Sequence, residues 1–268
     1  MSAPTTHPGT HPGTHSGTDS GPELTPLIAG NWKMHGVKAD LATLADIAGG
    51  LSGLRADVMI CPPATLIGSS VAQAHGTSLL IGAQDCHPTE NGAHTGDISV
   101  GMLKDAGATA VIVGHSERRS DHGETDAAVK AKADAAVSGG LTAIVCVGET
   151  AGQRQLGLAE RVVLRQLRAS LPDDVSPTRV VVAYEPVWAI GTGLTATPDD
   201  VAAMHASLRS ALMADYGATG AQIRLLYGGS VKPDNAAELL ATPNVNGALV
   251  GGASLKAADF LAIVRAAE

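Results

Sequence analysis

Residues 180–193 read VVVAYEPVWAIGTG, a strand pattern that ends on an isolated carboxylate. Val180–Tyr184 are apolar without interruption, which is typical of a parallel strand that is buried on both faces. Glu185 follows, and Pro186 begins a stiff segment that finishes on Gly-Thr-Gly. Such a glutamate either marks the point where a strand meets water or is a functional group that the strand holds in place. The rest of the chain distinguishes these two alternatives.

Short apolar runs of the same kind recur after residue 26 and alternate with helical patterns. The clearest helical pattern covers 198–215, where Thr197 can cap the helix and Pro198 stands at its first position. The eight runs that predict strands are 27–30, 57–61, 78–83, 110–114, 142–147, 180–184, 223–228 and 247–251.

Eight strand–helix units in residues 27–268 predict an α/β fold, a (β/α)₈ barrel, for which about 250 residues are typical. The alternative is a doubly wound open sheet. That sheet usually has fewer strands at this length, and no G-x-G-x-x-G pattern follows the first predicted strand. We therefore expect a single barrel domain over 27–268, with its active site where the strands end and the following loops begin.

Residues 1–26 differ from the rest, because they repeat Thr-His-Pro-Gly and contain few apolar side chains. This composition predicts a disordered tail, and it lacks the basic and apolar regions of a signal peptide. His7, His11 and His15 recur every four residues, but the prolines and glycines between them exclude a helix that would align them. We expect no more than weak, incidental metal binding there.

The composition excludes several classes of function. The chain has 268 residues, of which 44% are hydrophobic, and a formal net charge of −8. The acidic balance argues against nucleic acid as the main partner, and no apolar run approaches the roughly 18 residues of a membrane span. Cys61, Cys86 and Cys146 lie far apart without C-x-x-C spacing, so we expect buried free thiols, no metal site and a cytoplasmic location.

Three titratable side chains of different types follow three of the predicted strands. Lys33 comes after the first, His115 after the fourth and Glu185 after the sixth. Taken singly, such a lysine is an ordinary surface residue, and a histidine at a strand end is more often structural than catalytic. The ends of parallel strands meet at one face of a barrel, so together the three predict a cation, an acid–base group and a base.

The last two predicted strands are each followed by a glycine pair and a serine. The sequences are YGGS at 227–230 and VGGAS at 250–254. A single glycine pair is often only a turn. In barrels, however, the loops after these two strands often bind phosphate through backbone N–H groups, and glycine lets the backbone approach closely. The two pairs together predict an anion-binding site.

From about residue 27 to its end, the chain resembles the triosephosphate isomerase family. The most specific parts of the resemblance are YEPVWAIGTG and HSERR. The motifs occur in the order that the family has, namely GNWKMHG, GAHTGDIS, VIVGHSERR, CVGET, YEPVWAIGTG, YGGSV and NGALVGGASL.

The resemblance implies interconversion of dihydroxyacetone phosphate and D-glyceraldehyde 3-phosphate through an enediolate, in glycolysis and gluconeogenesis, without cofactor or metal. It implies that Glu185 is the base, that His115 polarises the carbonyl and that Lys33 attracts the substrate and steadies the developing charge. The start of a short helix after His115 should keep its imidazole neutral. Pro186–Gly193 corresponds to the lid that closes over the substrate in the family.

Further residues match supporting positions of the family. Asn31 matches a polar ligand beside Lys33, and Glu117 matches a carboxylate that supports this lysine. Ile190 and Leu249 match an apolar clamp that makes the catalytic carboxylate more basic. The groups expected to bind the phosphate are Gly191, Ser230, Gly251 and Gly252.

Residues 84–97, QDCHPTENGAHTGD, form a predicted loop of a length that is usually functional or disordered. The matching loop of the family inserts into a second subunit and brings Thr95 to the partner's active site, so the resemblance implies a homodimer. Two departures from the family pattern fall in this loop, because His94 replaces a frequent aromatic residue and Asp97 replaces the usual Glu. A third is Leu194, which stands after the lid where Lys is common.

Two alternative functions remain open from the sequence. A relative that isomerises a four-carbon ketose phosphate would keep the same base, electrophile and phosphate site. A non-catalytic phosphate-binding or adhesion protein would not need Lys33, His115 and Glu185 together.

Overall fold

The computed structural model describes residues 24–190 and 194–268. The predicted disordered tail lies outside these ranges up to residue 23. The predicted phosphate ligand Gly191 also lies outside them.

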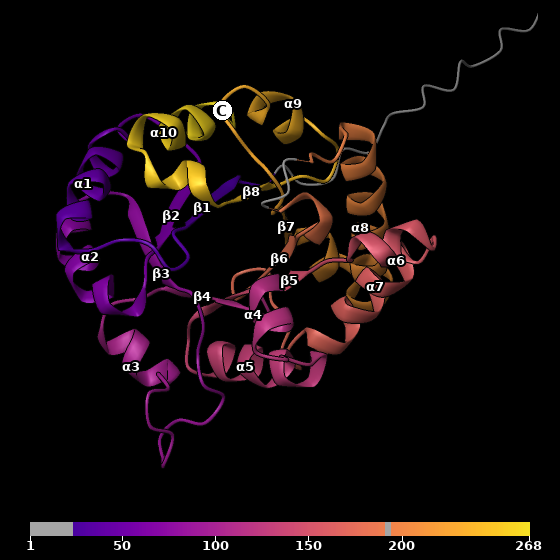
Figure 1. Ribbon diagram of the computed structural model, residues 1–268, viewed down its shortest axis with the longest axis horizontal. Coiled ribbons are helices and arrows are strands. Elements are labelled where there is room, and N and C mark those ends of the chain that lie inside the picture. Colours follow the sequence, from indigo (N-terminus) through magenta and orange to yellow (C-terminus); the bar gives the residue numbers. More distant parts are fainter. Residues whose placement is uncertain (1–23, 191–193) are drawn as a thin grey trace, which may run out of the picture.

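Eight parallel strands close into a barrel in the order of the sequence, which confirms the predicted fold (Figure 1). The barrel closes where Leu27 of the first strand pairs with Gly247 of the last. The strands are β1 (Leu27–Asn31), β2 (Asp57–Cys61), β3 (Leu79–Ala83), β4 (Ala110–Val113), β5 (Thr142–Val147), β6 (Val180–Tyr184), β7 (Arg224–Tyr227) and β8 (Gly247–Val250).

Helices surround the barrel as an outer ring (Figure 1). No helix in 24–190 or 194–268 is long and apolar enough to cross a membrane. The α-helices of these ranges are α1 (Leu41–Gly49), α2 (Ile67–Ala74), α3 (Val100–Asp105), α4 (Ser116–Asp121), α5 (Asp126–Ser138), α6 (Ala151–Gln155), α7 (Ala159–Ser170), α8 (Pro198–Gln222), α9 (Ala236–Leu240) and α10 (Ala257–Arg265).

Helix α8 begins where the sequence predicts and ends later. The Thr197 hydroxyl accepts the Asp200 N–H at 3.2 Å, and the Asp200 carboxylate accepts the Thr197 N–H at 3.1 Å, which together form a capping box. The helical path is interrupted at Gly217, whose φ of 58° an L-residue rarely adopts. The predicted end at 215 therefore marks the interruption, and a further helical stretch follows it.

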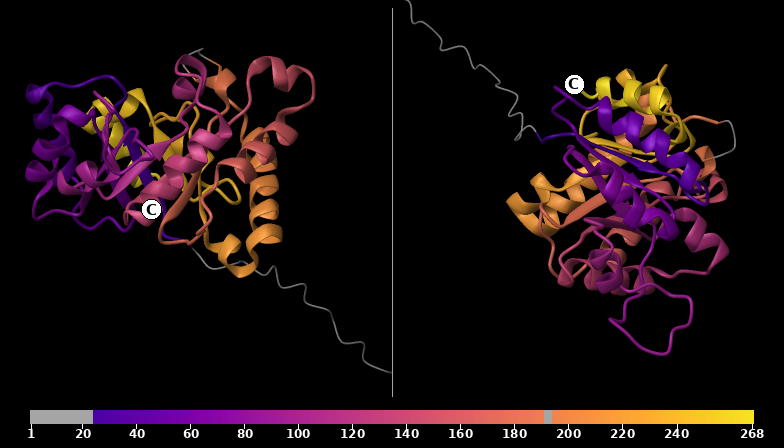
Figure 2. Two further views of the ribbon diagram at one scale, coloured as in Figure 1. Left: turned by 90° about the horizontal axis from the view of Figure 1, so that it is seen from below. Right: turned by 90° about the vertical axis from the view of Figure 1, so that its left-hand side faces the viewer.

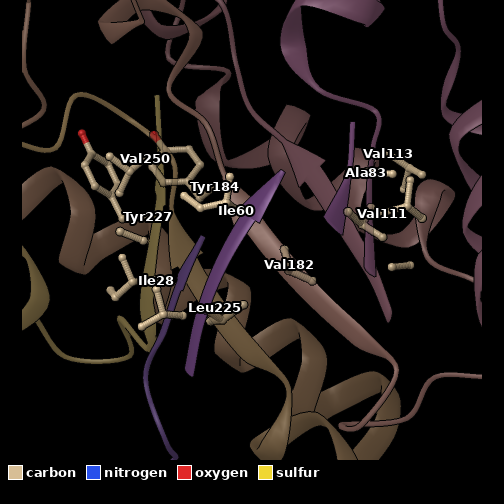
Figure 3. Close-up of a cluster of buried hydrophobic side chains, with 14 of the residues drawn as sticks. Ile28, Ile60, Ala83, Val111, Val113, Val182, Tyr184, Leu225, Tyr227 and Val250 are labelled. Carbon is tan, nitrogen blue, oxygen red and sulfur yellow. The ribbon is translucent and has the colours of Figure 1, made fainter. Parts of the chain in front are cut away.

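The strands are buried on both faces because their side chains alternate between two cores. One set fills the barrel, with Ala29, Met59, Ile112 and Leu249 among its members. The other set lies between the strands and the helices, and Figure 3 labels part of it: Ile28, Ile60, Ala83, Val111, Val113, Val182, Tyr184, Leu225, Tyr227 and Val250.

The three cysteines are free and buried, as predicted. Cys61 and Cys146 point into the barrel, whereas Cys86 belongs to the outer core. Burial raises the pKa of the Cys61 thiol to about 12, which makes this thiol unreactive at neutral pH.

Candidate active site

The carboxyl ends of the strands surround a cavity of about 420 Å³. It brings together the predicted site residues from β1, β4, β6, β7 and β8 and the loops that follow them. Glu117 lines an adjoining cavity instead, and Thr95 lines neither. The predicted residues that line the first cavity are Asn31, Lys33, His115, Glu185, Ile190, Ser230, Leu249, Gly251 and Gly252.

Glu185 lies directly after β6 and is 2% exposed. Its Oε2 accepts the Ser116 N–H at 3.0 Å, and its Oε1 is 2.9 Å from His115 Nε2. Glycines directly after the neighbouring strands β5 and β7 make room for it, since a Cβ at Gly148 would collide with the Glu185 carbonyl and a Cβ at Gly228 would press on its Cγ. The carboxylate is therefore held by its strand and faces the cavity.

His115 caps α4, so the start of this short helix fixes the orientation of the ring. Its Nδ1 accepts the Glu117 N–H at 3.3 Å, and its Nε2 points to Glu185. A ring nitrogen that accepts a hydrogen bond carries no proton, so the neutral ring in this orientation has its proton on Nε2. This proton can be donated into the cavity.

The surroundings of His115 shift the pKa of its imidazole upward, a direction that the sequence analysis did not anticipate. Burial lowers the pKa of the imidazole, but the carboxylates of Glu185 and Glu117 raise it by more, so the net direction is upward. Burial raises the pKa of Glu185, but the charge and hydrogen bond of His115 and the Ser116 N–H lower it by more. The expectation of a neutral imidazole considered the helix and left out the carboxylate from β6, which favours the protonated form; the neutral ring stays a prediction.

Lys33 has a φ of 52°, a conformation that costs a non-glycine residue on the order of 1–3 kcal/mol. Asn31 Oδ1 accepts the Lys33 N–H at 2.9 Å, and Gln84 Nε2 donates to the Lys33 carbonyl at 2.8 Å. The Lys33 ammonium lies 2.7 Å from Glu117 Oε1. The neighbouring side chains therefore hold both the strained backbone and the charged end of this lysine.

Two functional candidates were missed by the sequence analysis although both follow strands. Gln84 comes directly after β3 and also donates to the Cys61 carbonyl at 2.9 Å. Glu149 comes two residues after β5 and is fully buried. Its Oε1 accepts the Tyr184 hydroxyl at 3.1 Å and the Trp188 indole N–H at 2.8 Å. Both could have been found from the sequence by searching for polar side chains just after each predicted strand, which is how Lys33, His115 and Glu185 were identified.

The opposite wall of the cavity consists largely of the glycine-rich loops after β7 and β8. The space beside Gly252 is open, since no atom would lie within 4 Å of a Cβ built there. The Ser254 hydroxyl donates to the Gly251 carbonyl at 2.7 Å, which closes the turn after β8. Lys232, which the sequence analysis did not single out, adds a cation to this wall. Open backbone beside a lysine suits an anionic group.

The loop at 84–97 projects away from the barrel, which Figure 1 shows below α3 and the right-hand view of Figure 2 shows from the side. Thr95 of this loop is exposed. A cavity of about 820 Å³ lies between the base of this loop and the active site, and Lys33, Met34 and Glu117 contribute to its lining.

Comparison with known proteins agrees with the fold. The triosephosphate isomerase family model matches residues 26–267. The triosephosphate isomerase of Xanthobacter flavus is 63% identical over 244 residues, which cover 91% of this chain and 98% of the relative. That of Afipia carboxidovorans is 61% identical over 246 residues, with coverage of 91% and 98%. The crystal structure of triosephosphate isomerase from Bartonella henselae matches with a TM-score of 0.86 at 49% identity, over 91% of this chain and 99% of that one. The chain belongs to the triosephosphate isomerase family.

Proposed function

We propose that Glu185, His115 and Lys33 are the catalytic residues with which this chain interconverts dihydroxyacetone phosphate and D-glyceraldehyde 3-phosphate. The observation that carries this assignment is the 2.9 Å contact between Glu185 Oε1 and His115 Nε2 at the wall of the cavity. A base and a hydrogen-bond donor that meet at one point can act on a carbon and on its carbonyl oxygen together.

In the proposed reaction, the Glu185 carboxylate removes a proton from the carbon next to the carbonyl. The electrons of the broken C–H bond form the C=C bond of the enediolate; the His115 Nε2–H gives its proton to the former carbonyl oxygen, and the ring takes back the proton of the neighbouring hydroxyl, which is to become the new carbonyl oxygen. Glu185 then returns a proton to the neighbouring carbon, which completes the isomerisation. When Glu185 takes up the proton it loses the charge that raises the pKa of His115, so the imidazole favours its neutral form at the step where it must donate.

Lys33 supplies a positive charge beside the same cavity, and we assign it the binding of the substrate and the stabilisation of the developing oxyanion. Asn31 keeps the Lys33 backbone in place, and Glu117 holds its ammonium. The proposed phosphate site is the wall that contains Ser230, Gly251 and Gly252.

A coupled assay on the purified protein tests the proposed function. We expect turnover of both triose phosphates and a much lower kcat/KM for a four-carbon ketose phosphate. The comparisons support the triose phosphate substrate. Absence of turnover would favour the non-catalytic alternative. A higher kcat/KM for the four-carbon substrate would favour the alternative of a four-carbon ketose phosphate isomerase.

We further propose a homodimer in which the loop at 84–97 enters the 820 Å³ cavity of a second copy. The exposed apolar side chain of Met34, 95% exposed, at the edge of that cavity supports this proposal. Sedimentation should show a dimer for the natural protein and for Thr178→Arg, whose threonine precedes β6 at the opposite end of the barrel. Thr95→Arg should sediment as a monomer, and an intact Thr95→Arg dimer would contradict this arrangement.

We also propose that residues 27–268 form a single catalytic domain that acts in the cytoplasm, since the buried free thiols suit a reducing compartment. Deleting residues 1–25 should leave kcat/KM unchanged, because the tail contains few groups that could pack on the barrel. A large loss of activity in this variant would show that the tail contributes to the site.

A further inference from the structure

One lysine at the wall of the active-site cavity has no part in the proposed proton transfers. Lys232 follows β7, lines the cavity together with Ser230 and is exposed to solvent. Among the residues that the structure describes, none forms an ion pair with its ammonium. The charge of Lys33 is partly compensated instead, because Glu117 Oε1 lies 2.7 Å from its ammonium. Lys232 is therefore the less compensated of the two lysines that line the described cavity.

The backbone that carries Lys232 is fixed by one side chain. Asn235 Oδ1 accepts the Lys232 N–H at 2.8 Å, and Asn235 Nδ2 donates to the Ser230 carbonyl at 3.0 Å. The Lys232 carbonyl accepts the Ala236 N–H at 3.0 Å at the start of α9, and Pro233 restricts the backbone of Lys232. Asn235 thus couples the lysine to the serine of the proposed phosphate wall.

The two lysines adjoin different loops of this wall. A Cβ built on Gly251, in the loop after β8, would lie 3.6 Å from Lys33 Cε. Lys232 comes from the loop after β7. The described lining of the cavity also contains the carboxylate of Glu185, and the chain as a whole has a formal net charge of −8. A second cation at this wall therefore counters a field that would otherwise repel an anionic substrate.

We propose that Lys232 makes this cavity selective for doubly charged phosphate monoesters over singly charged anions of similar size. The inference rests on the proposed function, because it concerns the phosphate end of the same substrate. A phosphate monoester carries a charge of about −1.5 to −2 at neutral pH. An ammonium attracts the second negative charge more strongly than a neutral N–H group does, and it also speeds the approach of the ligand.

Lys232 also has an explanation without a role in binding, namely that of an ordinary exposed lysine that contributes to the charge of the surface. Any other exposed lysine would then be equivalent to it. Lys256 provides the comparison, because it is exposed and follows β8 but does not line the cavity. Lys232→Gln and Lys256→Gln change the net charge equally, so a difference between them shows that the position of the charge matters.

The first measurement is kcat/KM as a function of salt. At an ionic strength of about 0.01 M, where charges act over about 30 Å, Lys232→Gln should lower kcat/KM about three- to tenfold, mainly through a higher KM. At about 1 M, where they act over about 3 Å, it should come within about twofold of the natural protein. Lys256→Gln should follow the natural protein at both concentrations. Lys232→Arg should do so as well, because it keeps the charge.

The second measurement compares two anions that differ by one charge, sulfate and methanesulfonate. Their dissociation constants follow from an NMR titration of the backbone amide of Ser230. This titration needs no turnover, so it separates the present inference from the proposed function. The natural protein should bind sulfate more tightly than methanesulfonate. Lys232→Gln should reduce this preference by roughly threefold or more, whereas Lys256→Gln and Lys232→Arg should keep it.

Three results would overturn the proposal. The first is equal binding of the two anions by the natural protein. The second is a salt dependence and a sulfate preference in Lys232→Gln that match those of the natural protein, and the third is the same loss in Lys256→Gln as in Lys232→Gln. A sulfate preference that depends on Lys232 in a protein without turnover would support the anion selectivity and would count against the proposed function alone.

Discussion

Glu149 and Glu185 are buried glutamates at the ends of neighbouring strands, yet their surroundings differ. Glu149 Oε1 is shared by two donors, Tyr184 and Trp188, and this residue does not line the substrate cavity. Glu185 contacts His115 and the Ser116 N–H and faces the cavity. The comparison teaches that burial at a strand end does not make a carboxylate a base. Glu185, the proposed base, differs from Glu149 in that it faces the cavity beside the His115 ring.

Shortening each carboxylate by one methylene should have the largest effect and should separate the two residues. Glu185→Asp should lower kcat by about 10²-fold or more, because a base that retreats by about 1 Å no longer reaches the substrate carbon. Glu149→Asp should lower kcat less than tenfold, since this residue acts through Trp188. Steady-state kinetics on both variants checks the ranking, and similar losses in kcat would remove the distinction between them.

Replacing each glutamate by alanine should give the opposite ranking when Tm is measured instead of kcat. The change at Glu149 should then have the larger effect. Glu149→Ala leaves the buried Tyr184 hydroxyl without its acceptor, at about 1–3 kcal/mol. The Tm should fall by roughly 2–4 °C for each kcal/mol in a domain of this size. Glu185→Ala should lower the Tm less, because water in the cavity can replace the carboxylate. A larger fall for Glu185→Ala, seen by calorimetry, would contradict the structural role given to Glu149.

A smaller effect is expected at Gln84, which donates a hydrogen bond to the backbone carbonyl of Lys33. Gln84→Ala removes the donor to the carbonyl of a strained residue, and KM should rise by about tenfold while kcat changes less. Gln73→Ala, an exposed glutamine on α2, is the matched control. An unchanged KM in Gln84→Ala would show that Asn31 alone holds the Lys33 backbone.

The pH dependence gives the finest test of the Glu185–His115 pair. The folded-state pKa of His115 is raised, so its stabilising effect is complete below 6.5 and is lost as pH rises through the folded value. The folded-state pKa of Glu185 is lowered, so its effect is present above 4.5 and is lost as pH falls through the folded value. The pair should therefore stabilise the fold most between pH 4.5 and 6.5.

Glu185→Gln removes the charge that raises the pKa of His115. An NMR titration of the His115 ring should show a lower pKa in this variant than in the natural protein. An unchanged or higher pKa would mean that Glu117, at 3.4 Å from Nδ1, controls the ring instead.

The sequence predicted the barrel and the main site because both depend on local patterns. Each strand is a continuous apolar run, and Lys33, His115 and Glu185 each follow one. The same rule applied to β3 and β5 would have identified Gln84 and Glu149. What the sequence could not supply depends on neighbours far along the chain. Examples are the raised pKa of His115, which comes from a carboxylate on another strand, and the left-handed backbone of Lys33.

Isomerisation in D₂O tests most directly whether Glu185 is the base. Product formed by the natural protein should carry deuterium at the carbon that receives the proton, as NMR of the product can show. Glu185→Gln should lose this exchange by about 10²- to 10⁴-fold, the range that a general base contributes, and Glu149→Gln should keep most of it. Exchange that survives in Glu185→Gln and is lost in Glu149→Gln would show that Glu149, and not Glu185, is the base.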